Sequence, residues 1–156
     1  ADKERWSVLR LSQAIKEGRY EALPKAKGEK ENSPKLTRPG EPSYLYKALV
    51  KRVIDGDTLL LNIDLGFQVW KEQRLRLAAI DAPAIDEPEG EKAYRYVLNQ
   101  LARADFVMVK TNKIDIHGRY VGHVFFSLEK KSPDEVFRDG NYLNQKLVDE
   151  GLARIV

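Results

Sequence analysis

Three short segments of the sequence carry residue types that handle cations and phosphates. Carboxylates are oxygen ligands for hard cations, and a guanidinium group can donate two hydrogen bonds to a phosphate while it stays charged. The charged side chains of the three segments are Asp55, Asp57, Arg76, Asp81, Asp115 and Arg119. Each segment, taken alone, also has a purely structural explanation.

The first segment places Asp55 and Gly56 between two stretches that alternate bulky and polar residues. Asp-Gly is a tight-turn sequence, so a hairpin turn alone explains this pair. The turn does not require a second carboxylate, yet Asp57 supplies one. Asp57 is therefore the residue of this segment that points to chemistry.

The second segment places Arg76 and Asp81 at the two ends of an apolar stretch, five positions apart. An odd spacing in a strand puts two side chains on opposite faces, so both reach one site only if the strand twists or a bulge intervenes near Asp81. The third segment places Gly118 beside Arg119 at the start of a predicted strand. A surface hairpin is its structural explanation.

Together, in this order and at these separations, the segments resemble the staphylococcal nuclease family. The shared motifs are Asp-Gly-Asp-Thr, Arg-Leu-x-x-Ile-Asp-x-Pro, Asp-x-x-Gly-Arg and, at residues 144–153, Asn-x-x-Leu-Val-x-x-Gly-Leu-Ala. The resemblance covers residues 44–156. It implies a calcium-dependent nuclease that hydrolyses phosphodiester bonds of DNA and RNA with little sequence specificity, single-stranded DNA or RNA being the expected partner.

The resemblance also implies a calcium site and two phosphate-binding arginines. Asp57, Asp81 and the main-chain carbonyl of Ala82 would be the calcium ligands. Arg76 and Arg119 would hold the scissile phosphate and stabilise the charge that develops on it.

Two further residues of the third segment are implied to lie beside the substrate, Asp115 and His117. His117 stands where the family usually has a tyrosine near the substrate phosphate. The imidazole could donate a hydrogen bond there, and an ordinary turn histidine is the alternative.

One position departs from the family pattern. The catalytic glutamate of the family, proposed as the general base, corresponds to Ala84, and alanine cannot take a proton. The loop that follows carries Asp86, Glu87 and Glu89, of which Glu87 is the candidate replacement base. Solvated loop charges that favour a helix N-terminus are the alternative. A catalytically weakened or inactive domain, acting as a nucleic-acid-binding or protein-interaction module, is the competing function.

The elements that must position these residues follow from the hydrophobic periodicity. Alternation predicts strands over residues 44–53, 58–63, 106–110 and 120–126, and a bent strand over 67–80. Helical spacing predicts helices over 89–104 and 141–150, the second ending at Gly151. Residues 127–140 are expected to form a surface hairpin loop. This order fits an α+β domain, mainly β, in which two to three helices accompany a five-stranded barrel of the oligonucleotide-binding (OB) type.

Residues 1–43 differ from the predicted domain at 44–156. A short amphipathic helix is expected within residues 3–17, followed by a linker or arm rich in proline and lysine. Two roles are open for this region, contact with a protein partner or a grip on a phosphate backbone. The basic residues of the arm are Lys25, Lys27, Lys30, Lys35 and Arg38.

Charge and composition limit the function classes. The chain has 156 residues, 42% hydrophobic, which suffices for one core. Residues 1–43 hold 10 basic and 7 acidic residues, whereas 44–156 hold 17 of each, so net charge gives the domain no attraction for nucleic acid. A polybasic coating protein is therefore excluded.

Two absences in the sequence add further limits. Zero cysteines exclude disulfides, thiolate zinc sites and cysteine nucleophiles. No apolar run reaches the roughly 18 residues of a membrane span, so a soluble protein without a membrane partner is expected, in an undetermined compartment. Because the only methionine is Met108, we expect a processed or excised chain.

Overall fold

The computed structural model of the protein describes residues 33–114 and 120–156. The helix predicted within residues 3–17 and the lysines at 25–30 lie outside the described residues. So do three of the predicted site residues, Asp115, His117 and Arg119.

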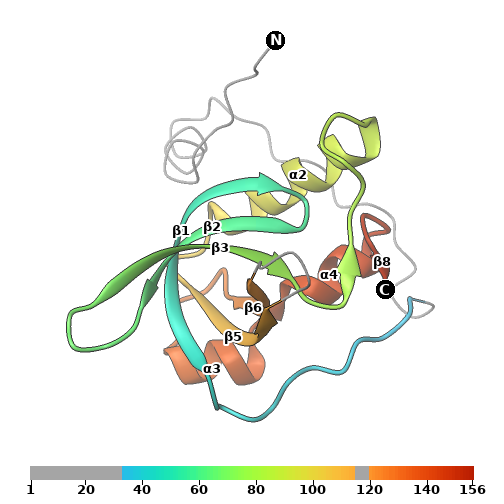
Figure 1. Ribbon diagram of the computed structural model, residues 1–156. Coiled ribbons are helices and arrows are strands. Elements are labelled where there is room, and N and C mark those ends of the chain that lie inside the picture. The colour runs from blue at the N-terminus through green and yellow to red at the C-terminus, as the bar shows by residue number, and fades with distance from the viewer. Residues whose placement is uncertain (1–32, 115–119) are drawn as a thin grey trace.

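Five strands close into a barrel. They are β1 (Leu45–Asp55), β2 (Thr58–Asp64), β3 (Trp70–Leu77), β5 (Val107–Ile114) and β6 (Tyr120–Phe126). Antiparallel neighbours follow the order β3-β2-β1-β5-β6, and parallel pairing of β3 with β6 closes the ring (Figure 1). The predicted five-stranded barrel is confirmed.

Three helices and three short strands complete the described part of the chain. The helices are α2 (Pro88–Leu101), α3 (Pro133–Asp139) and α4 (Leu143–Asp149), and the short strands are β4 (Ile80–Asp81), β7 (Asn141–Tyr142) and β8 (Arg154–Ile155). β7 extends the barrel sheet beside β6, and β4 pairs with β8 in a separate ladder. No helix in this part of the chain has the length and apolar character that crossing a membrane requires.

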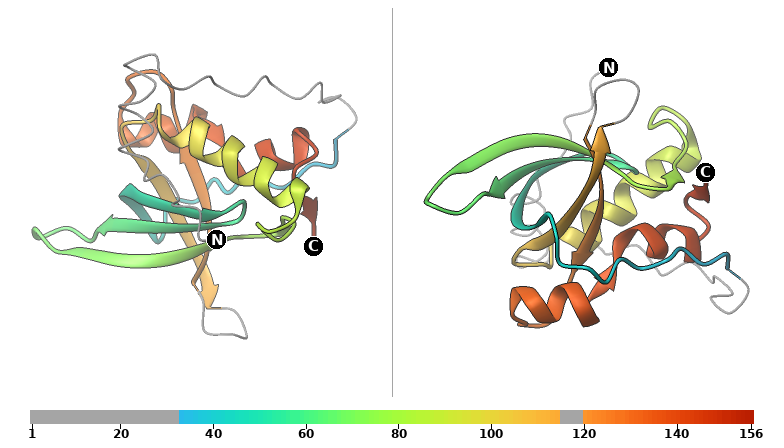
Figure 2. Two further views of the ribbon diagram at one scale, coloured as in Figure 1. Left: turned by 90° about the horizontal axis from the view of Figure 1, so that it is seen from above. Right: turned by 60° about the horizontal axis from the view of Figure 1, so that its bottom comes forward.

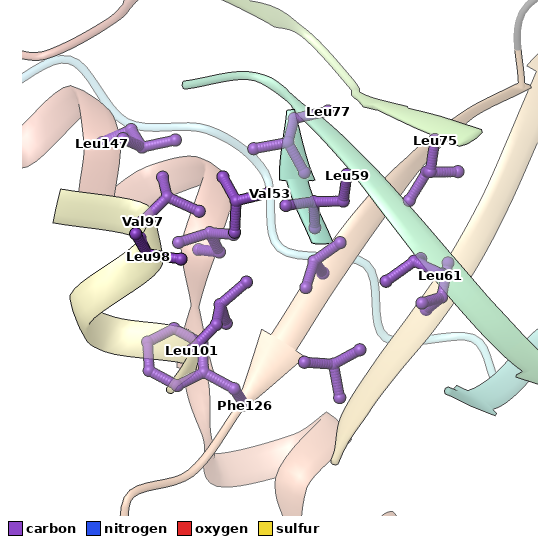
Figure 3. Close-up of a cluster of buried hydrophobic side chains, with 14 of the residues drawn as sticks. Val53, Leu59, Leu61, Leu75, Leu77, Val97, Leu98, Leu101, Phe126 and Leu147 are labelled. Carbon is purple, nitrogen blue, oxygen red and sulfur yellow. The ribbon is translucent and has the colours of Figure 1, made fainter. Parts of the chain in front are cut away.

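The core fills the barrel and the space beneath α2. Along β2 every second residue is buried, as expected for a strand with one face inward. Leu59 and Leu61 of β2 meet Leu75 and Leu77 of β3 inside the barrel, and α2 adds Val97, Leu98 and Leu101 to the same cluster (Figure 3). Two register shifts in β1 supply the bend that lets this strand join both sides of the barrel.

Two predicted elements are wrong in extent. The bent strand expected over 67–80 is split, because residues 65–69 form a hairpin tip and Ala78–Ala79 form a turn before β4. The surface loop expected over 127–140 contains α3. That helix begins with a capping box, in which Ser132 and Glu135 each bind the main-chain N–H of the other.

Residues 33–42 lie along the domain rather than away from it. The main-chain N–H of Leu36 donates to Gln145 Oε1 at 2.6 Å, and Gln145 Nε2 donates to the Pro34 carbonyl. Arg38 donates to the carbonyls of Gly140 and Phe137 at 2.7 and 2.8 Å, where α3 ends. Because these carbonyls have no partner within the helix, the hydrogen bonds from Arg38 stabilise the C-terminal end of α3.

Candidate active site

The turn between β1 and β2 buries Asp57 against α2. Asp55 pairs with Thr58, so Gly56 and Asp57 form a two-residue turn, and Asp55 Oδ1 accepts the N–H of Asp57 at 3.1 Å. A Cβ on Gly56 would lie 2.6 Å from the Cβ of Ala93 in α2. Glycine is therefore required for this close approach, and Asp57 is left only 7% exposed.

A break in the strand brings Arg76 and Asp81 to the same place. Ala79 adopts φ +66°, in the left-handed region, and this turns the chain between β3 and β4. Arg76 Nη2 then lies 2.9 Å from Asp81 Oδ1 and 3.5 Å from Asp57 Oδ2. The bulge or twist that the odd spacing requires is thus present as a turn at Ala79.

Asn144 of α4 holds this turn from inside the protein. Its Nδ2 donates to the carbonyls of Ala78 and Gly122 at 2.9 and 3.3 Å, and its Oδ1 accepts the N–H of Val124 at 3.1 Å. The side chain is fully buried, so each of these bonds replaces one that water would otherwise make. The asparagine of the C-terminal motif therefore joins the β3–β4 turn to β6.

The carboxyl group of Asp57 is held between opposing influences. Burial raises its pKa to about 6, with a contribution from the neighbouring Asp55 carboxylate, whereas the Ala82 N–H and the Arg76 guanidinium lower it. The Ala82 N–H donates to Oδ2 at 3.0 Å, and the Thr58 hydroxyl donates to Oδ1 at 3.2 Å. Near neutral pH the ionised carboxylate is thus supported by two hydrogen bonds and one cation.

This arrangement collects oxygen donors around one positive charge. Asp57 and Asp81 converge on a single guanidinium nitrogen, and the described residues contain no group of three or more His, Cys, Asp or Glu side chains suited to a metal. An all-oxygen set of two carboxylates suits a hard cation that keeps part of its water, and it does not suit zinc.

Comparison with known proteins decides the family. Residues 74–156 match the family described as staphylococcal nuclease homologues. The chain belongs to the staphylococcal nuclease family. Over 116 residues it is also 32% identical to the thermonuclease of Staphylococcus intermedius, a stretch covering 68% of this chain and 57% of that protein. The chain therefore spans less than two thirds of this relative's length.

The staphylococcal nuclease match includes the second motif and begins after Asp57. Arg119, Asp115 and His117 fall within the matched range, although the structure does not describe them. β6 begins at Tyr120, which pairs with Leu75, the residue before Arg76.

A cleft of about 910 Å³ opens beside the charged cluster of this nuclease-family domain. One wall is the segment from Asp81 to the start of α2, and the other is the C-terminal segment from residue 150 to 154. The charged residues that line it are Asp81, Glu87, Glu89, Lys92, Glu150 and Arg154. Four of these six are acidic, so the cleft has an acidic lining.

The position of the missing glutamate lies in this cleft, together with a replacement candidate. Ala84 and Glu87 both line it, whereas Asp86 does not. Glu87 is exposed and immediately precedes α2, where its side chain makes no capping hydrogen bond. A Cβ on Gly90 would lie 1.7 Å from the Ala84 carbonyl oxygen, so the loop is packed directly on the first turn of α2.

Sequence reasoning missed Glu150, which lines the same cleft. It is 7% exposed, and its Oε2 has no hydrogen-bond partner among the described residues. In the sequence, its one notable feature is its place directly before the Gly-Leu-Ala motif. The pairing of β8 with β4, which the sequence did not predict, places the C-terminal segment beside the cleft.

Proposed function

We propose that the protein is a calcium-dependent nuclease that hydrolyses phosphodiester bonds of DNA and RNA with little sequence specificity. The observation that carries the proposal is the convergence of Asp57 and Asp81 on the guanidinium of Arg76. Membership of the nuclease family supports it, as does the relative called a thermonuclease.

Asp57, Asp81 and the Ala82 carbonyl are the residues that would hold the calcium ion. The donor set fits, because Ca²⁺ takes carboxylate, carbonyl and water oxygens with little geometric demand. When bound, the ion supplies positive charge at the phosphate and acidifies a coordinated water. The hydrogen bonds from Ala82 and Thr58 keep the Asp57 carboxylate in one orientation for this role.

Arg76 would bind the scissile phosphate together with Arg119. A guanidinium remains charged at every relevant pH and can donate two hydrogen bonds to phosphate oxygens, whose negative charge grows in the transition state. Arg76 is fixed by the two carboxylates before substrate arrives, so little ordering of its side chain is left for the binding step. Asp115 and His117 would contact the substrate.

Cleavage by the purified protein tests this proposal. With millimolar Ca²⁺, the protein should cut single-stranded DNA and RNA, and the matched Arg119→Ala variant should cut at least about a hundredfold more slowly, as expected when one donor to the developing charge is lost. Chelation of calcium should stop the reaction. Equal rates for the protein and the Arg119→Ala variant would overturn the proposal.

Glu87 is proposed to accept the proton of the attacking water in place of the missing glutamate. It lines the cleft and its carboxylate is free of capping bonds. Glu87→Ala should lower the rate by about a hundredfold or more, whereas Asp86→Ala, one residue away and outside the cleft, should leave it unchanged. Similar rates for both variants would remove Glu87 from the mechanism.

Ala84 favours the second function, a domain that binds nucleic acid without cutting it. In that case binding survives chelation of calcium and no cleavage follows long incubation. Ala84→Glu separates the two functions, since restoring the carboxylate should create activity in an otherwise intact site. Full activity of the unaltered protein would exclude this second function.

A further inference from the structure

The hairpin between β2 and β3 ends in an exposed apolar tip. It projects away from the barrel in all three ribbon views (Figures 1 and 2). Phe67 is fully exposed, Trp70 is 45% exposed, and Leu65 and Val69 beside them are also exposed. The solvated tip buries none of the Phe67 ring, so the fold does not explain this residue.

The backbone of the tip makes the aromatic residue still harder to explain by folding. Phe67 and Gln68 have φ +54° and +62°, and the Val69 N–H donates to the Gly66 carbonyl at 2.9 Å. Positive φ at both central residues is the pattern that Asn-Gly prefers, and it strains the backbone of most other residues. A strained, wholly exposed aromatic points to a ligand.

The tip is continuous with the candidate active site along one face of the sheet. Trp70, Arg74 and Arg76 share the outer face of β3, because they are an even number of residues apart and the β2–β3 register is unbroken. Arg74 pairs with Leu60 of β2, and Leu60 pairs with Arg52 of β1. The cross-strand row next to Arg76 therefore consists of a leucine with one arginine on each side of it.

Charge distinguishes this face from the cleft on the other side of Arg76. Arg52 and Arg74 are exposed and form no ion pair with the residues that the structure describes. Two carboxylates of β2 and β3 share the face: Glu72 is bound to Lys51 at 2.8 Å, and Asp64, opposite Trp70, accepts the N–H of Gly66 at 2.9 Å. The cleft, by contrast, is lined by more acidic than basic residues. The rest of a polyanion bound at Arg76 is therefore attracted more strongly to the sheet face than to the cleft.

We infer that single-stranded nucleic acid extends from Arg76 along the outer face of β1, β2 and β3, with phosphates on Arg74 and Arg52 and bases stacked on Trp70 and Phe67. Six residues of strand separate Arg76 from Trp70, about 20 Å. OB barrels bind roughly 4 to 16 nucleotides, so this length is within range. The inference rests on the proposed function, because it extends that site.

Binding in a calcium-free buffer tests the inference separately from cleavage. Fluorescence anisotropy with an oligonucleotide of about 16 nucleotides should show at least about tenfold weaker binding for Phe67→Ala/Trp70→Ala, from the loss of base stacking. Leu128→Ala is the matched control, since Leu128 is an exposed apolar residue that follows β6. Phe67→Ala alone loses no packing, so weaker binding by that variant is not a folding defect.

The salt dependence of binding tests the arginines. Arg52→Gln/Arg74→Gln should reduce the slope of log affinity against log salt by about 1.4, since each lost single-strand phosphate contact contributes about 0.7. The control is Arg103→Gln at the far end of α2. Hairpin and arginine variants that bind like the unaltered protein would overturn the inference. Hairpin variants that change only the self-association of the protein, measured by sedimentation, would also overturn the inference, because the tip would then bind a second copy of the chain.

A cleavage assay distinguishes failure of the proposed nuclease function from failure of the inferred binding surface. A protein that cuts no oligonucleotide overturns the proposed function, while hairpin-dependent binding by that same protein upholds the surface assigned here.

Discussion

The charged cluster and the hairpin tip use side chains in opposite ways. At the cluster, Asp57, Arg76 and Asp81 are joined by ion pairs and main-chain hydrogen bonds, and the fold fixes each one. At the tip, Phe67 contacts nothing and occupies a backbone conformation that suits other residues better. The cluster would be understandable as structure alone, whereas the tip becomes understandable only with a ligand.

The difference teaches where function can be separated from stability. Removing a side chain from the cluster alters the fold and the chemistry together, since the remaining charges lose their partner. Removing Phe67 alters only what the protein binds. The following predictions test this separation, from the largest expected effect to the smallest.

Arg76→Ala should lower nuclease activity by at least about a hundredfold, because it removes a donor to the developing phosphate charge. It should also raise the pKa of Asp57 further above its ordinary value, since the guanidinium now opposes that rise. Initial rates on a dinucleotide with Ca²⁺ measure the first effect. Arg103→Ala is the control, and a rate for Arg76→Ala near the control would break the assignment of the cluster to catalysis.

Asn144→Ala should lower the free energy of unfolding by about 3 kcal/mol, because it leaves the Ala78 carbonyl and the Val124 N–H without the Asn144 partner that they have in the buried interior. Urea denaturation followed by circular dichroism measures this loss. A loss below about 1 kcal/mol would show that water or a local rearrangement satisfies these main-chain groups. The β3–β4 turn would then be stable without Asn144.

The stability of the calcium-free protein should fall as pH rises from about 4 to about 6. The pKa of Asp57 is raised from 3.8 to about 6 in the folded state, so the folded protein binds this proton more tightly than the unfolded chain. At about 1.4 kcal/mol per pKa unit, the contribution lost is about 2 to 3 kcal/mol. The unfolding free energy of the protein minus that of Asp57→Asn, measured with a chelator, should fall by this amount across the range and stay level above it.

Phe67→Asn should stabilise the protein by about 1 kcal/mol, because asparagine tolerates positive φ and no buried contact is lost. The same variant should bind a long oligonucleotide more weakly. Thermal unfolding and anisotropy on one preparation measure both effects. A variant that is less stable than the parent would show that Phe67 packs in the folded state, and the comparison between tip and cluster would then fail.

Hydrophobic periodicity was enough to predict the barrel, and the family resemblance implied that Asp57, Arg76 and Asp81 share one site. The means of their meeting could not be predicted, because an alanine in the left-handed region, Ala79, has no sequence signature. α3 had a signal, the Ser132 and Glu135 capping box, which the surrounding charges obscured.

The extent of the hairpin tip was hidden for a different reason. Phe67 and Val69 continue the alternation of a strand, so the strand was predicted to begin at residue 67, whereas β3 begins at Trp70. The acidic cleft was hidden because residues from two distant segments form it. Local periodicity thus revealed the elements, and tertiary pairing determined what they enclose.

Closure of the barrel has a kinetic consequence for the site. The parallel ladder that closes it joins Leu75, Arg76 and Leu77 to residues 120–122, across the whole of β4, α2 and β5. Pairings this distant in sequence form slowly during folding, because a long loop must be ordered first. Arg76 therefore lies in one of the pairings that form late. Amide hydrogen exchange at residues 75–77 should report opening of the barrel, and a ligand on Arg76 should slow that exchange by mass action.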